Sequence, residues 1–154
     1  MEKTVQIKHI FNNTDITKLY QVVSEIAILA DDAQVEKQTK TELILKRIWN
    51  LPKAVSKLLN INNKIPYHQI VDIDLPNDRF LCQTTVKIKQ YTLKVAILYK
   101  SSAEDVICKG KIIINGVKNI SLRQLAVNMT KNEFKACRKH EEKIMKQKNK
   151  TLLS

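Results

Sequence analysis

The segment NISLRQLAVNMTKNEFKACRKHEEKIMKQK, residues 119–148, decides the fold, because no Gly or Pro interrupts it. A stretch of this length and composition predicts one long C-terminal helix. Its apolar residues recur at spacings of three and four, which places them along one side of a helix with 3.6 residues per turn. The residues of this apolar stripe are Leu122, Leu125, Ala126, Met129, Ala136, Cys137 and Ile144.

The apolar stripe has a gap at Asn132 and Glu133, where another apolar residue is due, and Phe134 falls away from its centre. Two interpretations are open. The helix is either fully packed with one polar position in its buried face, or it roofs a cavity into which polar side chains project. The pattern alone favours the packed helix, since apolar side chains serve cores more often than ligand sites.

Length and composition indicate one folded domain. A chain of 154 residues can bury a real core, and 44% hydrophobic with 27% charged residues is typical of a globular protein. We expect the domain to span residues 1–148 and residues 149–154 to form a frayed tail. The formal net charge of +12 predicts a negatively charged partner: nucleic acid, an anionic lipid surface or an acidic protein.

The cysteines and the N-terminus exclude several other classes. Cys82, Cys108 and Cys137 are widely spaced, odd in number and outside any CxxC or Cys/His pattern, so we expect reduced core residues rather than disulfides or a zinc site. No apolar run reaches the length of a membrane span. The segment Met1–Val5 begins neither a secretory signal nor an Arg-rich transit peptide, so any entry into an organelle is expected without a cleaved address.

The rest of the chain predicts an α+β order of elements. Alternation and turn residues indicate a strand at 4–11, a helix from Ile16 to about Ala30, one or two strands within 34–49, a short helix after Pro52, and three or four antiparallel strands within 65–74, 79–90, 91–100 and 105–114. This order is not the alternation of a βαβ fold. A curved antiparallel sheet that wraps around the long helix is consistent with this order of elements. Such a sheet leaves an apolar hollow between itself and the helix.

Catalytic motifs are absent. The sequence has no GxSxG, Gly-rich phosphate loop or HExxH, and His9, His68 and His140 are scattered. Asp72 and Asp74 alternate at the end of a strand, a pattern more typical of a turn than of acid–base chemistry. We therefore expect a non-enzymatic protein without a metal or cofactor.

The basic residues fit a lipid surface better than a nucleic acid. Many of them lie on the C-terminal helix, where a solvated face explains most, and others lie on the strands, so that together they could meet anionic headgroups. Aromatic residues are few and no recognised RNA- or DNA-binding motif is present. Nucleic acid is not expected as the partner, although a basic binding module for RNA or an acidic protein remains the alternative.

A family resemblance adds to this interpretation. Arg47-Ile48-Trp49-Asn50-Leu51-Pro52, followed by Tyr67-His68-Gln69-Ile70-Val71-Asp72, resembles the PRELI family, in which an Arg-containing strand runs into a Leu-Pro helix start and then a strand ending in Val-Asp or Val-Asn. Further similar segments occur in the same order as in that family. They are His9-Ile10-Phe11, Thr84-Thr85-Val86, Leu98-Tyr99 and Ile113-Ile114-Asn115-Gly116-Val117.

The resemblance implies a START-like helix-grip fold: a curved antiparallel β-sheet wrapped around a long C-terminal α-helix. It also implies transfer of a phospholipid between membranes, with phosphatidic acid or phosphatidylserine as the cargo. The implied location is the mitochondrial intermembrane space, with the cytoplasm as the alternative. The implied protein partner is a small twin-CX9C helical protein.

The resemblance further assigns a site. By position, Arg47 matches the family's strand arginine, and Asn132 with Lys135 matches an Asn-x-x-Lys step that faces the lipid headgroup. A guanidinium, an amide and an ammonium at the mouth of an apolar cavity would hold a phosphate by charge-assisted hydrogen bonds. This match favours the helix as a cavity roof, and the cavity below is expected to be lined by Trp49, Leu122, Leu125 and Met129.

The chain departs from the family pattern at the expected rim of the cavity. Ala30-Asp31-Asp32-Ala33 stands where the family has Tyr-Pro-Asn-Pro, and the basic residues usual between the arginine element and Leu-Pro are missing. The sequence therefore resembles a divergent member.

Overall fold

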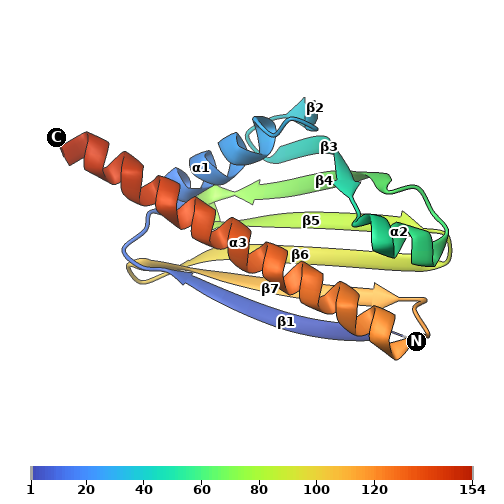
Figure 1. Ribbon diagram of the computed structural model, residues 1–154. Helices are drawn as coiled ribbons and strands as arrows, with labels where there is room; N and C mark the ends of the chain where they lie inside the picture. Colours follow the sequence, from blue (N-terminus) through green and yellow to red (C-terminus); the bar gives the residue numbers. More distant parts are fainter. Residues whose placement is uncertain (1, 154) are drawn as a thin grey trace.

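Alternating strand segments pair into one antiparallel sheet in the computed structural model, which describes residues 2–153 (Figure 1). Within these residues the sheet has seven strands in the order β1-β7-β6-β5-β4-β3-β2. The strands are β1 (Glu2–Phe11), β2 (Gln34–Gln38), β3 (Glu42–Asn50), β4 (Lys64–Asp74), β5 (Arg79–Ile88), β6 (Tyr91–Ser102) and β7 (Asp105–Asn115). The segment predicted as one or two strands is therefore the pair β2 and β3.

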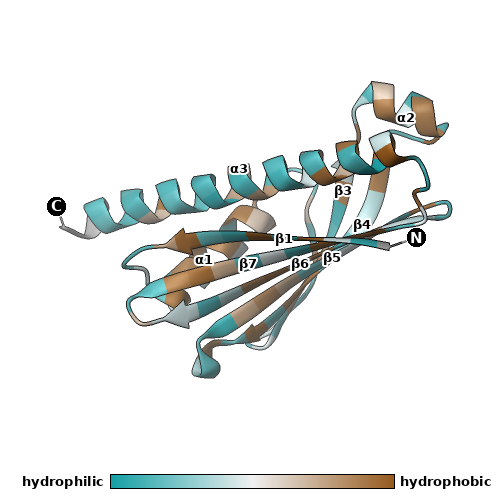
Figure 2. Ribbon diagram, turned by 90° about the horizontal axis from the view of Figure 1, so that it is seen from below, coloured by the Kyte–Doolittle hydropathy of each residue, from teal (hydrophilic) through white to brown (hydrophobic). Residues whose placement is uncertain are grey.

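The helices all lie on one face of this sheet. They are α1 (Ile16–Ile28), α2 (Lys53–Leu59) and α3 (Ile120–Leu153), with a short 3-10 turn, η1 (Leu75–Asn77), between β4 and β5. Figures 1 and 2 show α3 crossing the sheet diagonally, with α1 beside its second half and α2 beside its first turns. The predicted order of strands and helices is confirmed.

Helix α1 begins as its sequence predicts. The carboxylate of Asp15 accepts a hydrogen bond from the backbone N–H of Lys18 at 3.0 Å and so caps the helix. The buried face consists of Ile16, Leu19, Val22, Val23 and Ala27. The helix ends at Ile28, two residues before the predicted end at about Ala30.

The most deeply buried face of α3 is displaced from the predicted apolar stripe, although Leu122, Ala126 and Ile144 of that stripe pack against the core clusters. Its buried residues are Val127, Phe134, Arg138, Glu141 and Met145, which again follow a spacing of three, four or seven. The expectation that Ala136 belongs to the buried face is wrong: Ala136 is exposed, while Phe134 is 4% exposed. The sheet accepts Phe134 because β7 carries a glycine, Gly110, directly opposite the ring.

The structure shows where α3 begins and where it ends. The chain turns into the helix at Gly116, whose φ is +86°, and a Cβ there would lie 2.1 Å from the carbonyl oxygen of Gln90. At the other end the helix continues to Leu153, through most of the segment 149–154 that was expected to fray. Ser154 lies outside the described residues. No helix within residues 2–153 combines the length and apolar character needed to cross a membrane.

Candidate ligand-binding chamber

A chamber of about 670 Å³ lies between α3, α1 and the strands β3 to β6. Its walls are mainly apolar. Val23, Ile26 and Ala27 contribute from α1, and Val95 and Ile97 contribute from β6. Residues of the main core, such as Tyr99 and Phe134, and of the smaller apolar cluster under α2, such as Val86, both contribute to the chamber wall. The long helix therefore roofs a hollow, which decides between the two interpretations of its sequence.

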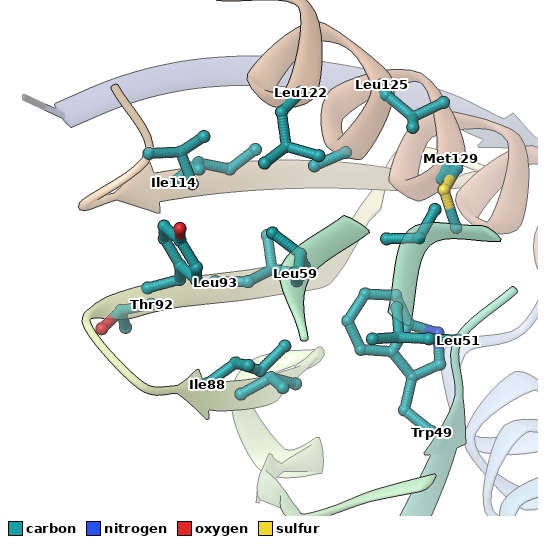
Figure 3. Close-up of a pocket in the computed structure, with 15 residues that line it drawn as sticks. Trp49, Leu51, Leu59, Ile88, Thr92, Leu93, Ile114, Leu122, Leu125 and Met129 are labelled. Carbon is teal, nitrogen blue, oxygen red and sulfur yellow. The ribbon is translucent and has the colours of Figure 1, made fainter. Parts of the chain in front are cut away.

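An apolar annex of about 70 Å³ adjoins the chamber beneath α2 and the first turns of α3. The chamber and the annex share Trp49, Val86, Leu93 and Met129 on their walls. Figure 3 shows side chains from β3, β5, β6, β7, α2 and α3 converging on the annex. The residues that the sequence analysis placed on a cavity wall all lie there: Trp49, Leu122, Leu125 and Met129.

Polar side chains form a belt across the chamber. Arg47, Tyr67, Gln69 and Thr84 project from three neighbouring strands, and Thr130, Glu133 and Cys137 line the opposite wall on α3. Burial raises the pKa of the Tyr67 hydroxyl above its usual value, so the phenol stays neutral. The belt therefore offers hydrogen-bonding groups at the middle of an apolar space.

The guanidinium of Arg47 is already paired. Its Nε lies 3.0 Å from Oδ2 of Asp32, its Nη2 lies 3.3 Å from Oδ1 of the same carboxylate, and its Nη1 donates to the side chain of Gln69 at 3.1 Å. Asp32 also accepts a hydrogen bond from the backbone N–H of Ile48 at 2.7 Å. The hydrogen bond from Arg47 lowers the pKa of Asp32, so this carboxylate remains charged. The segment that departs from the PRELI pattern thus supplies a counter-ion to the site arginine.

The structure does not bring the predicted headgroup residues together. Arg47 lies on the chamber wall, but Asn132 and Lys135 are exposed and lie outside the wall. The reason is helical phase: each residue turns the helix by about 100°, so positions such as Thr130, Glu133 and Cys137 face the chamber in their place. Asn132 and Lys135 therefore do not line the chamber wall, and their contact with a headgroup stays a prediction.

A buried charged cluster that was not predicted from the sequence forms the end of the chamber away from the annex. The Nε and Nη2 groups of Arg138 each donate to the carboxylate of Glu141 at 2.7 Å, and the hydroxyl of Tyr99 donates to Glu141 at 2.9 Å. The guanidinium also lies over the rings of Tyr99 and Phe134, at 5.5 and 5.0 Å from their centroids. The available signal was the spacing of Arg138 and Glu141 from Phe134 and Met145, but a charged pair on a helix usually indicates a solvated face.

The cysteines and histidines do not form a reactive cluster. Burial raises the pKa of Cys82 and Cys108 to about 12 and that of Cys137 to about 11, so all three free thiols stay protonated. Two of them are buried as expected, whereas Cys137 is half-buried at the chamber wall. Among the residues that the structure describes, no group of His, Cys, Asp and Glu could hold a metal ion.

Comparison with known proteins supports the fold. No protein-family model matches the sequence, and no curated protein matches it. Solved structures do match in three dimensions. The protein TTHA0849 from Thermus thermophilus is 9% identical, with 92% of this chain and 95% of that chain covered and a TM-score of 0.61. A START superfamily protein from Mycobacterium smegmatis is 8% identical, with 93% and 98% covered and a TM-score of 0.52.

A third match, Ara h 8.0201, is 9% identical, with 92% and 98% of the two chains covered and a TM-score of 0.52. At such low identity these likenesses show the fold alone. The START-like helix-grip fold predicted from the sequence is confirmed, and the resemblance to the PRELI family rests on the sequence.

Proposed function

We propose that the protein binds an amphipathic lipid in its chamber and carries it between membranes. The observation that carries this proposal is the chamber itself. Its volume of about 670 Å³ lies within the range of roughly 300–1,000 Å³ that is usual for small-molecule sites. Apolar walls with a belt of hydrogen-bonding groups suit a ligand that has both an apolar body and a polar group.

The end of the molecule around the annex suits a membrane surface. The segments 51–64, 86–93 and 114–126 supply most of the annex wall and contain no Asp or Glu. We call these three segments the basic end; their charged residues are Lys53, Lys57, Lys64, Lys87, Lys89, Lys118 and Arg123. Strand β1 begins beside them and adds Glu2 and Lys3. Such a surface is complementary to anionic headgroups.

Exposed apolar side chains accompany this charge. Leu58 on α2 and Ile120 at the start of α3 are 71% and 73% exposed, and Leu125 on α3 is 42% exposed. Apolar side chains surrounded by lysines are typical of a surface that lies in the membrane interface. The annex and the surface that would meet the membrane therefore belong to the same end of the protein.

The resemblance to PRELI proteins supports a finer form of the proposal. In that form the cargo is phosphatidic acid or phosphatidylserine, Arg47 contributes to headgroup binding, and the protein acts in the mitochondrial intermembrane space with a small twin-CX9C helical partner. The competing function is that of a basic module for RNA or an acidic protein, which the net charge of +12 favours.

Native mass spectrometry of the freshly purified protein separates these functions. A co-purifying lipid mass supports the chamber, whereas bound nucleic acid and no lipid would support the basic module. Transfer of fluorescent phospholipids between vesicles then tests carriage. Val95→Phe, which projects an aromatic ring into the chamber, should reduce transfer, and Val35→Phe on the exposed edge strand β2 should not. Absence of any lipid binding would sink the proposed function.

A further inference from the structure

Both arginines around the chamber form ion pairs with carboxylates, and one further carboxylate is not part of an ion pair. Arg47 pairs with Asp32, and Arg138 pairs with Glu141. The remaining carboxylate, Glu133, is an exposed side chain on the wall and forms no ion pair among the described residues. Counted together, two guanidiniums face three carboxylates, so the chamber has no positive charge to spare.

The two arginines differ in what they can offer to a ligand. The side chain of Arg138 is only 7% exposed, and its Nε and Nη2 groups are used by Glu141. Its Nη1 group has no hydrogen-bond partner among the described residues, although the residue lies on the chamber wall. Nη1 is not sealed off from solvent, so it remains available to donate a hydrogen bond to an acceptor on a ligand that enters the chamber. Arg47, in contrast, uses all three of its nitrogens.

An anionic headgroup would meet an unfavourable environment here. Arg47 keeps one spare N–H on each of its Nη atoms, but its charge is already balanced by Asp32, which is held in place by a second hydrogen bond to the backbone of Ile48. To bind Arg138, a phosphate would place a further negative charge beside Glu141 in a buried space, where an uncompensated charge is strongly disfavoured. Glu133 on the same wall would add to the repulsion.

We propose, on the basis of the proposed function but in place of its phosphatidic acid or phosphatidylserine form, that the chamber selects a lipid whose polar group is uncharged, a hydroxyl or carbonyl that accepts a hydrogen bond from Arg138. Its apolar body extends along α3 to the annex. Met129, at the border of the annex, lies nine residues before Arg138 (138 − 129), which is about 14 Å along a helix. The ligand class is therefore a long neutral amphiphile, such as a diacylglycerol or a sterol-like alcohol.

The test compares two lipids with the same acyl chains, dioleoylglycerol and dioleoyl phosphatidic acid. Binding is measured for each by displacement of a fluorescent fatty alcohol from the full-length protein. The wild type should bind dioleoylglycerol at least about tenfold more tightly. Equal or tighter binding of phosphatidic acid would overturn the inference and leave the proposed function standing. Binding of neither lipid would overturn both.

Charge variants test the cause of this preference. Asp32→Asn combined with Glu133→Gln removes two of the three carboxylates and should shift the ratio of affinities toward phosphatidic acid by about tenfold. Glu104→Gln removes an exposed carboxylate in the turn between β6 and β7 and should leave the ratio unchanged. An unaltered ratio in the double variant, with folding confirmed by circular dichroism, would overturn the assignment of selectivity to these charges.

Discussion

The ring of Phe134 on α3 packs directly against Gly110 on β7. A Cβ atom at position 110 would lie 2.7 Å from Cε2 of the ring, closer than real Cβ contacts permit. The glycine thus allows the middle of α3 to approach the β7 side of the sheet. The space left between the helix and β3 to β6 is the chamber.

Gly110→Val should force this contact apart. Overpacking of a buried site costs about 1–3 kcal/mol, so the free energy of unfolding should fall by that amount. Urea unfolding followed by circular dichroism measures the change. Adding Phe134→Leu should recover part of the loss, because a smaller side chain makes room for the valine. If the stability losses of Gly110→Val and Phe134→Leu, each measured alone, simply add in the double variant, the contact with Phe134 is not the cause of the destabilisation.

The Arg138–Glu141 pair should respond differently to single and double substitutions. Glu141→Leu leaves a buried guanidinium without its carboxylate and should lower the free energy of unfolding by about 3–5 kcal/mol. Arg138→Met together with Glu141→Leu removes both charges and should be less destabilising than the single change. Denaturant unfolding of both variants measures this. A double variant with a lower free energy of unfolding than Glu141→Leu would show that the pair does not behave as one unit.

Stability at acid pH should depend on Asp32. Its pKa is lowered in the folded protein, chiefly by the hydrogen bond from Arg47, relative to an ordinary value of 3.8. This contribution is fully present above 3.8 and is lost as the pH falls through the lower folded-state pKa. Asp32→Asn should therefore reduce stability at neutral pH and flatten the acid decline below 3.8. Thermal unfolding across this range should show no such flattening for the exposed neighbour, in Asp31→Asn.

Trp49 should report on ligand binding. It is the single tryptophan of the chain and lies on the walls of both the chamber and the annex. A lipid that enters this space should displace water from the indole and shift its emission to shorter wavelength. Ala126→Phe, which fills the annex, should weaken the response about tenfold, whereas Leu29→Phe at a 78% exposed position should not. An unchanged spectrum with bound ligand would place the ligand elsewhere.

The basic end should control membrane association. Lysines close to an anionic surface contribute roughly 1 kcal/mol each, so Lys53→Glu with Lys57→Glu should weaken binding to phosphatidylserine vesicles at least about tenfold. Lys40→Glu with Lys100→Glu makes the same change of charge outside the basic end. Vesicle sedimentation at low salt measures both, and higher salt should reduce binding. Equal losses for the two pairs would show that net charge, rather than the basic end, directs binding.

The features that could be predicted from the sequence are those that depend on residues close to one another in the chain. The cap at Asp15, the turn at Gly116 and the alternation of the strands depend on neighbours in the chain, and each was predictable. The annex residues Leu122, Leu125 and Met129 could also be found, since an apolar side chain faces away from water whether it meets a core or a hollow. Asn132 and Lys135 were placed by their position in a motif, which carries no information about helical phase against the sheet.

The sequence by itself determined the order of strands and helices, the long terminal helix and the excess of positive charge. Only the tertiary structure decided which face of α3 is buried and which charges neutralise one another. Tyr99 and Glu141 are 42 residues apart and Arg47 and Asp32 are 15 apart, so neither pairing leaves a periodic signal. Whether an arginine is free to bind a ligand depends on such distant partners, because desolvation makes a buried charge take the nearest counter-ion that the fold supplies.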